Sequence, residues 1–172
     1  MAVGVGSAAR VLLAVGALVV LSSCGFQLRT WDLSSSVDSF FVQVSGNNPL
    51  ETPLRRAMQQ AGVTAAESAN AADVVVRLLD MRRARRGVSV TARARVAEYE
   101  LNLSTLYSVT RAQEQLLAPQ WARSSRVYRV DRDNLVGSSE EQALLEREMQ
   151  SDLVQQIIRA VNAVTTEVAG AA

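Results

Sequence analysis

The sequence of 172 residues has no histidine, no lysine and a single cysteine, Cys24. Intramolecular disulfides, cysteine-rich zinc sites and sites that depend on histidine are therefore excluded. Among common catalytic chemistries, only chemistry based on carboxylates remains. Hydrophobic residues make up 48% of the chain, and a chain of this length buries about 70% of its unfolded surface. We therefore expect one folded domain that requires no disulfide, metal or cofactor.

All 18 basic residues are arginines, and 17 acidic residues balance them. A chain that begins at Cys24 would carry 17 residues of each charge and have no net charge. Domains that bind nucleic acids usually carry a clear positive charge, so we expect no nucleic-acid partner. Only a local cluster of arginines could bind an anion.

The N-terminal segment is typical of a secretory signal. A short region ends at Arg10, and the apolar run that follows, residues 11–21, would measure about 17 Å as a helix. This is too short to cross a hydrocarbon core of about 30 Å. Leu21-Ser22-Ser23-Cys24 resembles the bacterial lipobox, whose cysteine is acylated and becomes the new N-terminus. An ordinary cleaved signal with a chance cysteine is the alternative.

We accordingly predict a signal peptide over residues 1–23 and a single periplasm-facing domain over residues 24–172. Acyl chains such as palmitate on Cys24 would anchor this domain, since several chains give a lasting membrane attachment. Gly25 follows the cysteine, where lipoproteins kept in the inner membrane carry an aspartate. The expected location is the periplasmic side of the outer membrane.

The first elements predicted after the anchor are a strand over Phe40–Ser45 and a short helix. Thr52 followed by Pro53 predicts an N-cap and the first residue of that helix, which ends at Gly62. A start at Asn48 would place Pro53 inside the helix at a cost of about 3 kcal/mol. We therefore favour the later start.

Three further strands are predicted. Val74–Leu79 is rich in β-branched residues and is typical of a buried strand. Apolar residues then alternate from Val88 to Val109, but the alternation changes phase near Ala97. Such a change predicts a bulge or kink within one long strand. Pro119 interrupts the pattern, and residues 120–130 form the last predicted strand.

The C-terminal region predicts a long helix. Overlapping capping boxes begin at Ser138 and Ser139, and apolar residues recur every three to four positions from Leu145 to Val168. The helix would measure about 40 Å and end at Gly170. The element order β-α-β-β-β-α predicts an α+β fold, with a single mixed or antiparallel sheet of about four strands covered on one face by two helices.

One cluster of basic residues stands out, comprising Arg82, Arg83, Arg85, Arg86, Arg93 and Arg95. Guanidinium groups bind phosphates in a bidentate manner, so a basic end of a sheet could hold the phosphates of lipopolysaccharide. A solvated turn beside a protected sheet edge is the alternative.

Glu98 and Glu100 would share one face of a strand, as paired carboxylates do in some glycosidases. Nothing else in the sequence supports catalysis. A structural or interface role is favoured, and we do not expect an enzyme.

Several short motifs together resemble the family of lipopolysaccharide-assembly lipoproteins named LptE. The resemblance covers nearly the whole chain after the signal in order, and rests on Cys24-Gly-Phe-Gln-Leu-Arg29, Ala97-Glu-Tyr-Glu-Leu101, Arg126-Val-Tyr-Arg129, Glu141-Gln142 and Glu148-Met149. It implies a lipoprotein that plugs the β-barrel of LptD, assists its assembly and binds lipopolysaccharide during insertion into the outer leaflet.

The resemblance also implies which arginines contact lipopolysaccharide. Arg93 and Arg95 are the favoured candidates for phosphate contact, and Arg83 and Arg86 are further candidates. The chain departs from the family before the last helix, where no basic residue lies nearer than Arg132. A second basic contact is not expected there.

Two other functions stay open. A lipid carrier would need a roomy apolar pocket between sheet and helices, beside small residues such as Ala57 and Ala61. A hydrolase that uses Glu98 and Glu100 would place both carboxylates in a cleft. A plug would present them on a flat or convex surface.

Overall fold

The computed structural model describes residues 32–90, 96–130 and 135–170. The chain divides into two compact units, Met1–Thr30 and Trp31–Ala172, and all described residues belong to the second. The predicted signal peptide and Cys24 lie outside the described residues. Within the part of the chain described, no helix is long and apolar enough to cross a membrane.

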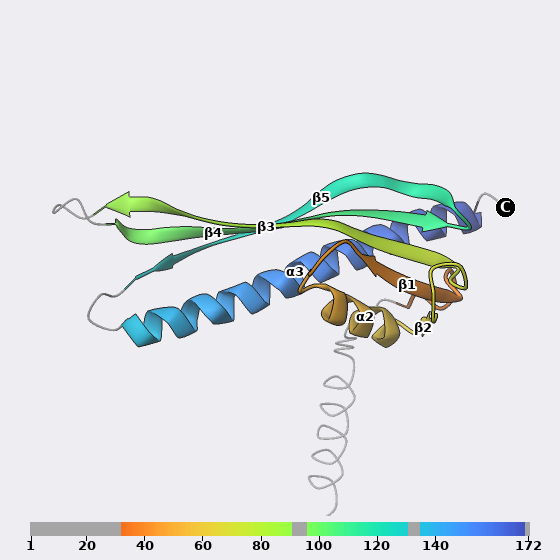
Figure 1. Ribbon diagram of the computed structural model, residues 1–172, viewed down its shortest axis with the longest axis horizontal. Coiled ribbons are helices and arrows are strands. Elements are labelled where there is room, and N and C mark those ends of the chain that lie inside the picture. Colours follow the sequence, from red (N-terminus) through yellow and green to blue (C-terminus); the bar gives the residue numbers. More distant parts are fainter. Residues whose placement is uncertain (1–31, 91–95, 131–134, 171–172) are drawn as a thin grey trace, which may run out of the picture. The chain divides into compact units, whose positions relative to one another are not determined.

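The described residues fold into one open sheet and two helices (Figure 1). Its strand order is β2-β1-β3-β4-β5, in which β1 runs parallel to β2 and β3, and the β3–β4 and β4–β5 pairs are antiparallel. The predicted α+β class and the order of the main elements are confirmed, with β2 as an additional strand of two residues. The elements are β1 Ser39–Val44, α2 Glu51–Gln60, β2 Thr64–Ala65, β3 Val74–Val90, β4 Val96–Arg111, β5 Glu114–Arg129 and α3 Leu135–Gly170.

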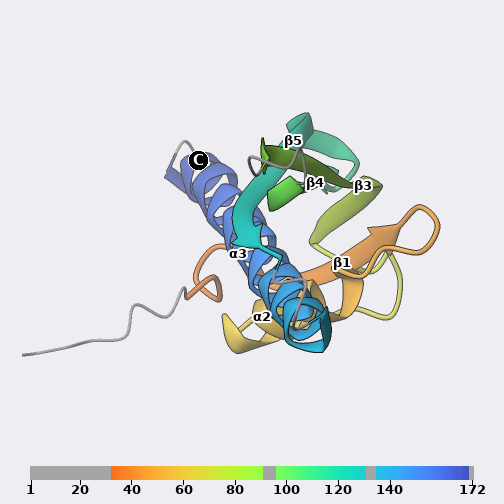
Figure 2. The same ribbon diagram turned by 90° about the vertical axis from the view of Figure 1, so that its left-hand side faces the viewer.

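Both helices cover the same face of the sheet, as the end-on view in Figure 2 shows. The sheet contributes alternate residues to this side because successive side chains of a strand point to opposite faces. The buried core formed between the layers includes Val74, Val76, Leu78, Leu101, Leu103 and Tyr107 from the sheet, Leu54 and Met58 from α2, and Leu153, Ile157 and Val161 from α3. On the opposite face of the sheet, called the outer face below, no helix of the described residues packs.

The strand β3 is much longer than predicted. It pairs with β1 only over Val74–Leu78 and continues beside β4 to Val90. The basic residues 82–86 therefore lie within a strand and not in a turn. We call the part of the sheet formed by residues 80–90, 96–106 and 121–129 the distal half.

The predicted single strand from Val88 to Val109 is wrong. Residues up to Val90 belong to β3, and Val96 begins the antiparallel strand β4. A reversal of the chain separates Val90 of β3 from Val96 of β4. The predicted irregularity near Ala97 is confirmed within β4, because the pairing passes from Ser89 opposite Glu98 to Val90 opposite Val96 and skips Ala97. A further irregularity lies between Leu78 and Asp80.

The preferred start of the first helix is also wrong. The helix α2 begins at Glu51, and the Asn48 side chain accepts a 3.0 Å hydrogen bond from the backbone N–H of Leu50. Pro53 is thus the third helical residue. The N–H groups of the first turn have no partner within a helix, so proline is tolerated there without the penalty of an interior position.

Two other boundaries differ from the prediction. The helix α3 begins at Leu135, before the serines at 138 and 139, and its 36 residues correspond to about 54 Å. The strand β5 already begins at Glu114 and contains Pro119. Proline is accommodated because β5 is an edge strand, and its pairing with β4 is irregular between Tyr107 and Val109.

Candidate functional site

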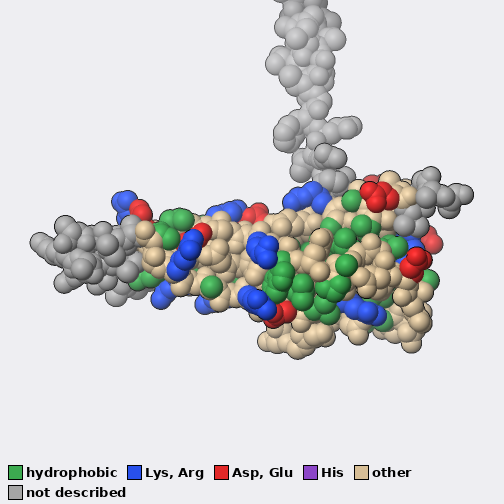
Figure 3. Space-filling model, turned by 90° about the horizontal axis from the view of Figure 1, so that it is seen from above, with side chains coloured by type: hydrophobic (Ala, Val, Ile, Leu, Met, Phe, Trp, Pro, Cys, Tyr) green, Lys and Arg blue, Asp and Glu red, His purple; other side chains and the backbone are tan. Residues whose placement is uncertain are grey.

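The arginines of the distal half are divided between the two faces of the sheet. This division follows from the strand period of two residues and from the cross-strand register. Those on the outer face are Arg82, Arg86, Arg123 and Arg129, and those on the face toward the helices are Arg83, Arg85 and Arg126. Figure 3 looks onto the outer face and shows basic side chains spread along it, with acidic side chains beside several of them.

Acidic and aromatic groups accompany most of the outer arginines. Arg86 donates a hydrogen bond to Glu100, which also accepts one of 2.9 Å from Ser125. Arg82 lies 2.9 Å from Asp80, and its guanidinium carbon is 4.4 Å from the centre of the Trp121 ring. The hydrogen bond from Arg86, and next that from Ser125, lower the pKa of Glu100 below its ordinary value of 4.5.

On the side toward the helices, two arginines connect β3 to its neighbours. Arg83 forms a 2.9 Å ion pair with Glu146 of α3. Arg85 places its guanidinium 4.7 Å from the centre of the Tyr99 ring and donates a 3.5 Å hydrogen bond to the Tyr128 hydroxyl. This hydrogen bond is the main cause that raises the pKa of Arg85.

A third contact joins β5 to α3. Asp152 accepts hydrogen bonds from Arg126 and, at 3.1 Å, from the Ser124 hydroxyl. Polar contacts to α3 thus add to the packing of buried residues such as Leu101 and Leu103 in the distal half. The charged residues on this side position the strands against α3.

The four arginines predicted to contact lipopolysaccharide are not gathered into one surface by the described residues. Arg93 and Arg95 lie outside those residues, between the end of β3 and the start of β4. Arg83 and Arg86 occupy opposite faces of β3, and each is paired with a carboxylate. Both side chains are accessible, with exposed fractions of 63% and 73% respectively.

Sequence reasoning did not single out the contribution of β5 to the outer face. Arg123, Arg129 and Trp121 join Arg82 and Arg86 there through the pairing of β4 with its two neighbours. The spacing within residues 121–129 indicates that Trp121, Arg123 and Arg129 share one face of their strand. The pairing of β4 with β3 and β5, which brings this face beside that of β3, depends on residues distant in the sequence.

Glu98 and Glu100 do share one face of β4, as expected from their spacing. Each contacts an arginine, with Arg129 lying 3.2 Å from Glu98 and Arg86 bonded to Glu100. Within the described ranges, no group of three residues could hold a metal ion. Both carboxylates thus form ion pairs with arginines on the outer face of the sheet.

Comparison with known families gives a match over most of this fold. The model of the family LptE, described as lipopolysaccharide-assembly, matches residues 37–161. The chain belongs to the LptE family. The match extends from just before β1 into α3 and includes the whole distal half. It assigns the chain to lipopolysaccharide assembly.

Solved structures of several bacterial lipoproteins share this fold. The rare lipoprotein B from Shewanella oneidensis is 22% identical, with a TM-score of 0.68 over 76% of this chain and 98% of that protein. Lipoprotein B from Nitrosomonas europaea is 25% identical, with a TM-score of 0.68 over 83% and 93%. A minor lipoprotein from Acinetobacter baumannii is 22% identical, with a TM-score of 0.60 over 74% and 92%. Comparison with curated protein sequences finds no match.

Proposed function

We propose that this protein is an outer-membrane lipoprotein, attached on the periplasmic side through acylated Cys24. It plugs the β-barrel of LptD, helps this barrel to assemble and binds lipopolysaccharide during its insertion into the outer leaflet. The observation that carries the proposal is the LptE family match over residues 37–161. The protein works by occupying space and pairing charges, without bond chemistry.

The lipopolysaccharide contact is assigned first to Arg93 and Arg95, which follow β3 and precede β4 in the sequence. Arg83 and Arg86 of β3 are further candidates. Phosphate groups match the planar fork of guanidinium. Arg83 and Arg86 are already paired with Glu146 and Glu100, which compete with a phosphate, so their contribution is the smaller one.

The plugging role is supported by the outer face of the sheet. This face is open, and it combines paired charges with apolar groups such as Val127, which is 59% exposed, and the half-buried Trp121. Aromatic and arginine side chains are enriched at interfaces between proteins. A near-obligate complex with the lumen of a barrel commonly buries more than about 2,000 Å².

The two alternatives receive less support from the site. A lipid carrier requires an apolar pocket, whereas the hollow beside Ala57 is also lined by arginines and glutamines. A hydrolase requires Glu98 and Glu100 in a cleft, whereas both carboxylates lie on an open strand face and contact arginines.

The decisive experiment uses the mature acylated protein with Arg93→Glu and Arg95→Glu. We expect lipopolysaccharide binding to weaken at least about ten-fold, since charged hydrogen bonds contribute about 1.5–3 kcal/mol each, while co-purification with LptD persists. The control is Arg55→Glu with Arg159→Glu, which changes the net charge equally at exposed helix positions. Unchanged lipopolysaccharide binding in the folded variant would remove the assignment of these arginines.

The partner and the anchor are tested separately. Affinity purification of the native protein from outer membranes should recover a stoichiometric barrel. Mass spectrometry should find acyl chains on Cys24. Recovery without a barrel would favour the lipid carrier, and an unmodified cysteine would contradict the proposed anchor.

A further inference from the structure

A groove between α2 and α3 forms a cavity of about 330 Å³, and no strand residue lines it. Its polar lining consists of two guanidinium groups, three amides and one hydroxyl. None of the described residues that line it is acidic, so it presents positive charge and many hydrogen-bond donors. This composition suits an anion with several oxygen acceptors. The polar residues are Arg56, Gln60, Arg147, Gln150, Ser151 and Gln155.

The two arginines of the groove differ from most others in the described part of the chain. Seven arginines there form ion pairs, and Arg77 and Arg85 donate to neutral side chains. Four have neither kind of contact among the described residues, and two of these four line the groove. An anion binding there would not have to displace an internal carboxylate. The four are Arg56, Arg123, Arg147 and Arg159.

The chain enters the domain beside this groove. The backbone N–H of Leu33 donates a 3.0 Å hydrogen bond to the carbonyl of Ala61, directly after α2. Cys24 is only eight residues before Asp32, and an extended segment of this length spans at most about 28 Å. Arg56 is a further five helical residues from Ala61, about 8 Å along the helix. A membrane anchor at Cys24 therefore leaves α2 within reach of the leaflet, at most about 36 Å away by these two lengths.

We propose that the groove between α2 and α3 binds the headgroup of an anionic glycerophospholipid, with the phosphodiester held by Arg56 and Arg147. The source of this ligand is the leaflet that holds the anchor, so the inference rests on the proposed acylation of Cys24. The absence of acidic lining residues favours a headgroup with net negative charge, because no carboxylate receives the ammonium group of a zwitterionic lipid. This contact is separate from the lipopolysaccharide contact in the distal half.

The test measures partitioning onto vesicles of a chain that begins at Gly25, which cannot be acylated. This chain retains the whole core cluster, which starts at Leu33, and the whole compact unit from Trp31 onward. Vesicles of phosphatidylcholine alone are compared with vesicles of equal parts phosphatidylglycerol and phosphatidylcholine. Each basic side chain at an anionic surface strengthens binding about five-fold. We expect a preference of at least about ten-fold for the anionic vesicles.

The variant Arg56→Glu with Arg147→Glu should lose most of this preference. The matched control is Arg123→Glu with Arg159→Glu, which reverses the two other unpaired arginines and changes the net charge equally. This control should retain at least half of the preference. Circular dichroism verifies folding, and Arg56→Gln with Arg147→Gln replaces the first variant if it does not fold.

Three results would overturn the proposal. In the first, the parent chain shows no preference for anionic vesicles. In the second, the groove variant and the control lose this preference equally. In the third, millimolar glycerol phosphate releases the parent chain from the vesicles. The last result would assign the groove to a free phosphate ester. The effect of Arg93→Glu and Arg95→Glu on lipopolysaccharide binding, and the mass of Cys24, test the proposed function independently of these results.

Discussion

The Tyr128 hydroxyl on β5 donates a 2.8 Å hydrogen bond to Oε1 of Gln142 on α3. The amide of Gln142 in turn donates 2.9 Å to Glu146, whose other carboxylate oxygen accepts from Arg83 of β3. A chain of polar contacts therefore runs from one strand across α3 to another strand. These residues hold the beginning of α3 on the sheet, where its apolar contacts are fewer than they are after Met149.

Replacing Tyr128 by phenylalanine tests this connection. The change removes the hydroxyl, keeps the ring, and leaves Gln142 and Arg85 without that partner. We expect the free energy of unfolding to fall by about 1 kcal/mol, measured by urea denaturation. The control is Tyr99→Phe, since the Tyr99 hydroxyl has no hydrogen bond among the described residues. An equal effect of both changes would refute a specific role of the Tyr128 hydroxyl.

The apolar half of α3 should respond far more strongly. Leu153 is completely buried in the core between the helix and the sheet. Leu153→Ala removes buried methyl groups and leaves a cavity, so we expect a loss of about 2–5 kcal/mol in the free energy of unfolding. Arg159→Ala on the exposed side of the same helix should change stability by less than about 0.5 kcal/mol. A small effect at Leu153 would mean that α3 packs less tightly than observed.

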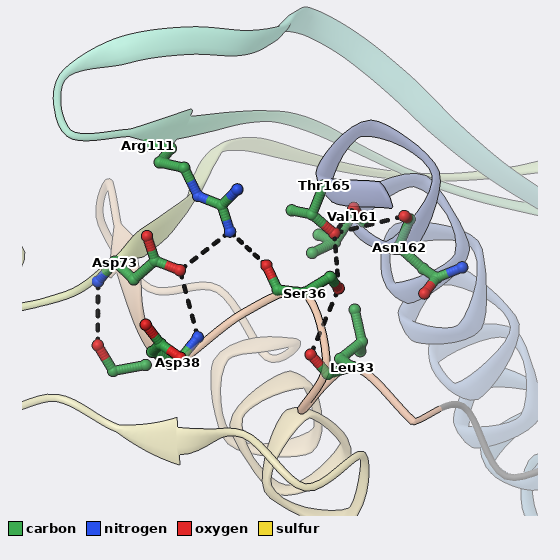
Figure 4. A network of polar contacts seen from close by, with 9 residues as sticks. Leu33, Ser36, Asp38, Asp73, Arg111, Val161, Asn162 and Thr165 are labelled. Carbon is green, nitrogen blue, oxygen red and sulfur yellow. Dashed lines mark hydrogen bonds and ion pairs between the residues drawn. The ribbon is translucent and has the colours of Figure 1, made fainter. Parts of the chain in front are cut away.

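Arg111 links the end of β4 to the first loop of the domain. Figure 4 shows its guanidinium between Asp73 and the carbonyl of Ser36, at 3.0 Å and 2.5 Å. The Ser36 hydroxyl also lies 3.2 Å from that of Thr165 on α3. The side chains of Arg111 and Asp73 are only 21% and 26% exposed. This partly buried pair attaches the loop that follows the proposed anchor to the rest of the domain.

We expect Arg111→Met to lower the free energy of unfolding by about 1–2 kcal/mol, as judged by thermal and urea unfolding. The loss leaves the Asp73 carboxylate without its cation. The loss in the free energy of unfolding is moderate, because the change also removes the buried Nε atom of Arg111. This atom has no hydrogen-bond partner among the described residues. Arg55→Met removes an exposed pair with Glu51 and should alter stability by less than about 0.5 kcal/mol. Similar losses in both variants would contradict the importance of burial.

The sequence contains enough information to predict the layers of the fold. The alternation at 99–109 and the spacing from Leu145 to Val164 identify the buried faces of β4 and α3 correctly. The sequence does not indicate the reversal after Val90, because residues 91–95 contain no glycine, proline or asparagine that would favour a turn. The start of α2 differs from the prediction because Pro53 occupies the first turn, where proline is tolerated, and not the helix interior.

The arrangement of the candidate site was harder to predict from the sequence than the layers of the fold. The basic cluster is local in sequence, but its arrangement depends on partners that are distant. Glu100 meets Arg86 across the β3–β4 pair, and Glu146 reaches Arg83 from another element 63 residues away. No periodicity within residues 82–86 indicates either carboxylate. Side-chain register and helix placement, which are tertiary properties, decide which arginines are paired.

The pairing of Glu100 with Arg86 predicts a dependence on pH. The pKa of Glu100 in the folded protein is lower than its ordinary value of 4.5. Its contribution to stability is therefore complete above pH 4.5 and is lost as the pH falls through the lower, folded-state value. Glu100→Gln should be less stable than the parent at pH 7, and the difference should shrink at about pH 3.

Unfolding in urea across this pH range measures the effect. Glu114→Gln is the control, because Glu114 is exposed and forms no ion pair within the described residues. Its difference from the parent should stay nearly constant. A gap between Glu100→Gln and the parent that widens on acidification would show that the sign of the pKa shift is wrong.

The same carboxylates should limit the affinity for lipopolysaccharide if Arg83 and Arg86 take part in binding. A phosphate competes with Glu146 for Arg83 and with Glu100 for Arg86, and both guanidinium groups are largely exposed, so each ion pair contributes little. Releasing one arginine should therefore strengthen binding up to about five-fold. We expect this gain for Glu100→Gln and for Glu146→Gln in equilibrium binding assays, and a smaller gain for Glu114→Gln, which adds the same charge elsewhere.

Equal gains in all three variants would assign the effect to net charge. Weaker binding after Glu146→Gln would indicate that Arg83 must be held by α3 to be effective. A gain restricted to Glu100→Gln would place the contact on the outer face, because Arg86 and Arg83 point to opposite sides of β3.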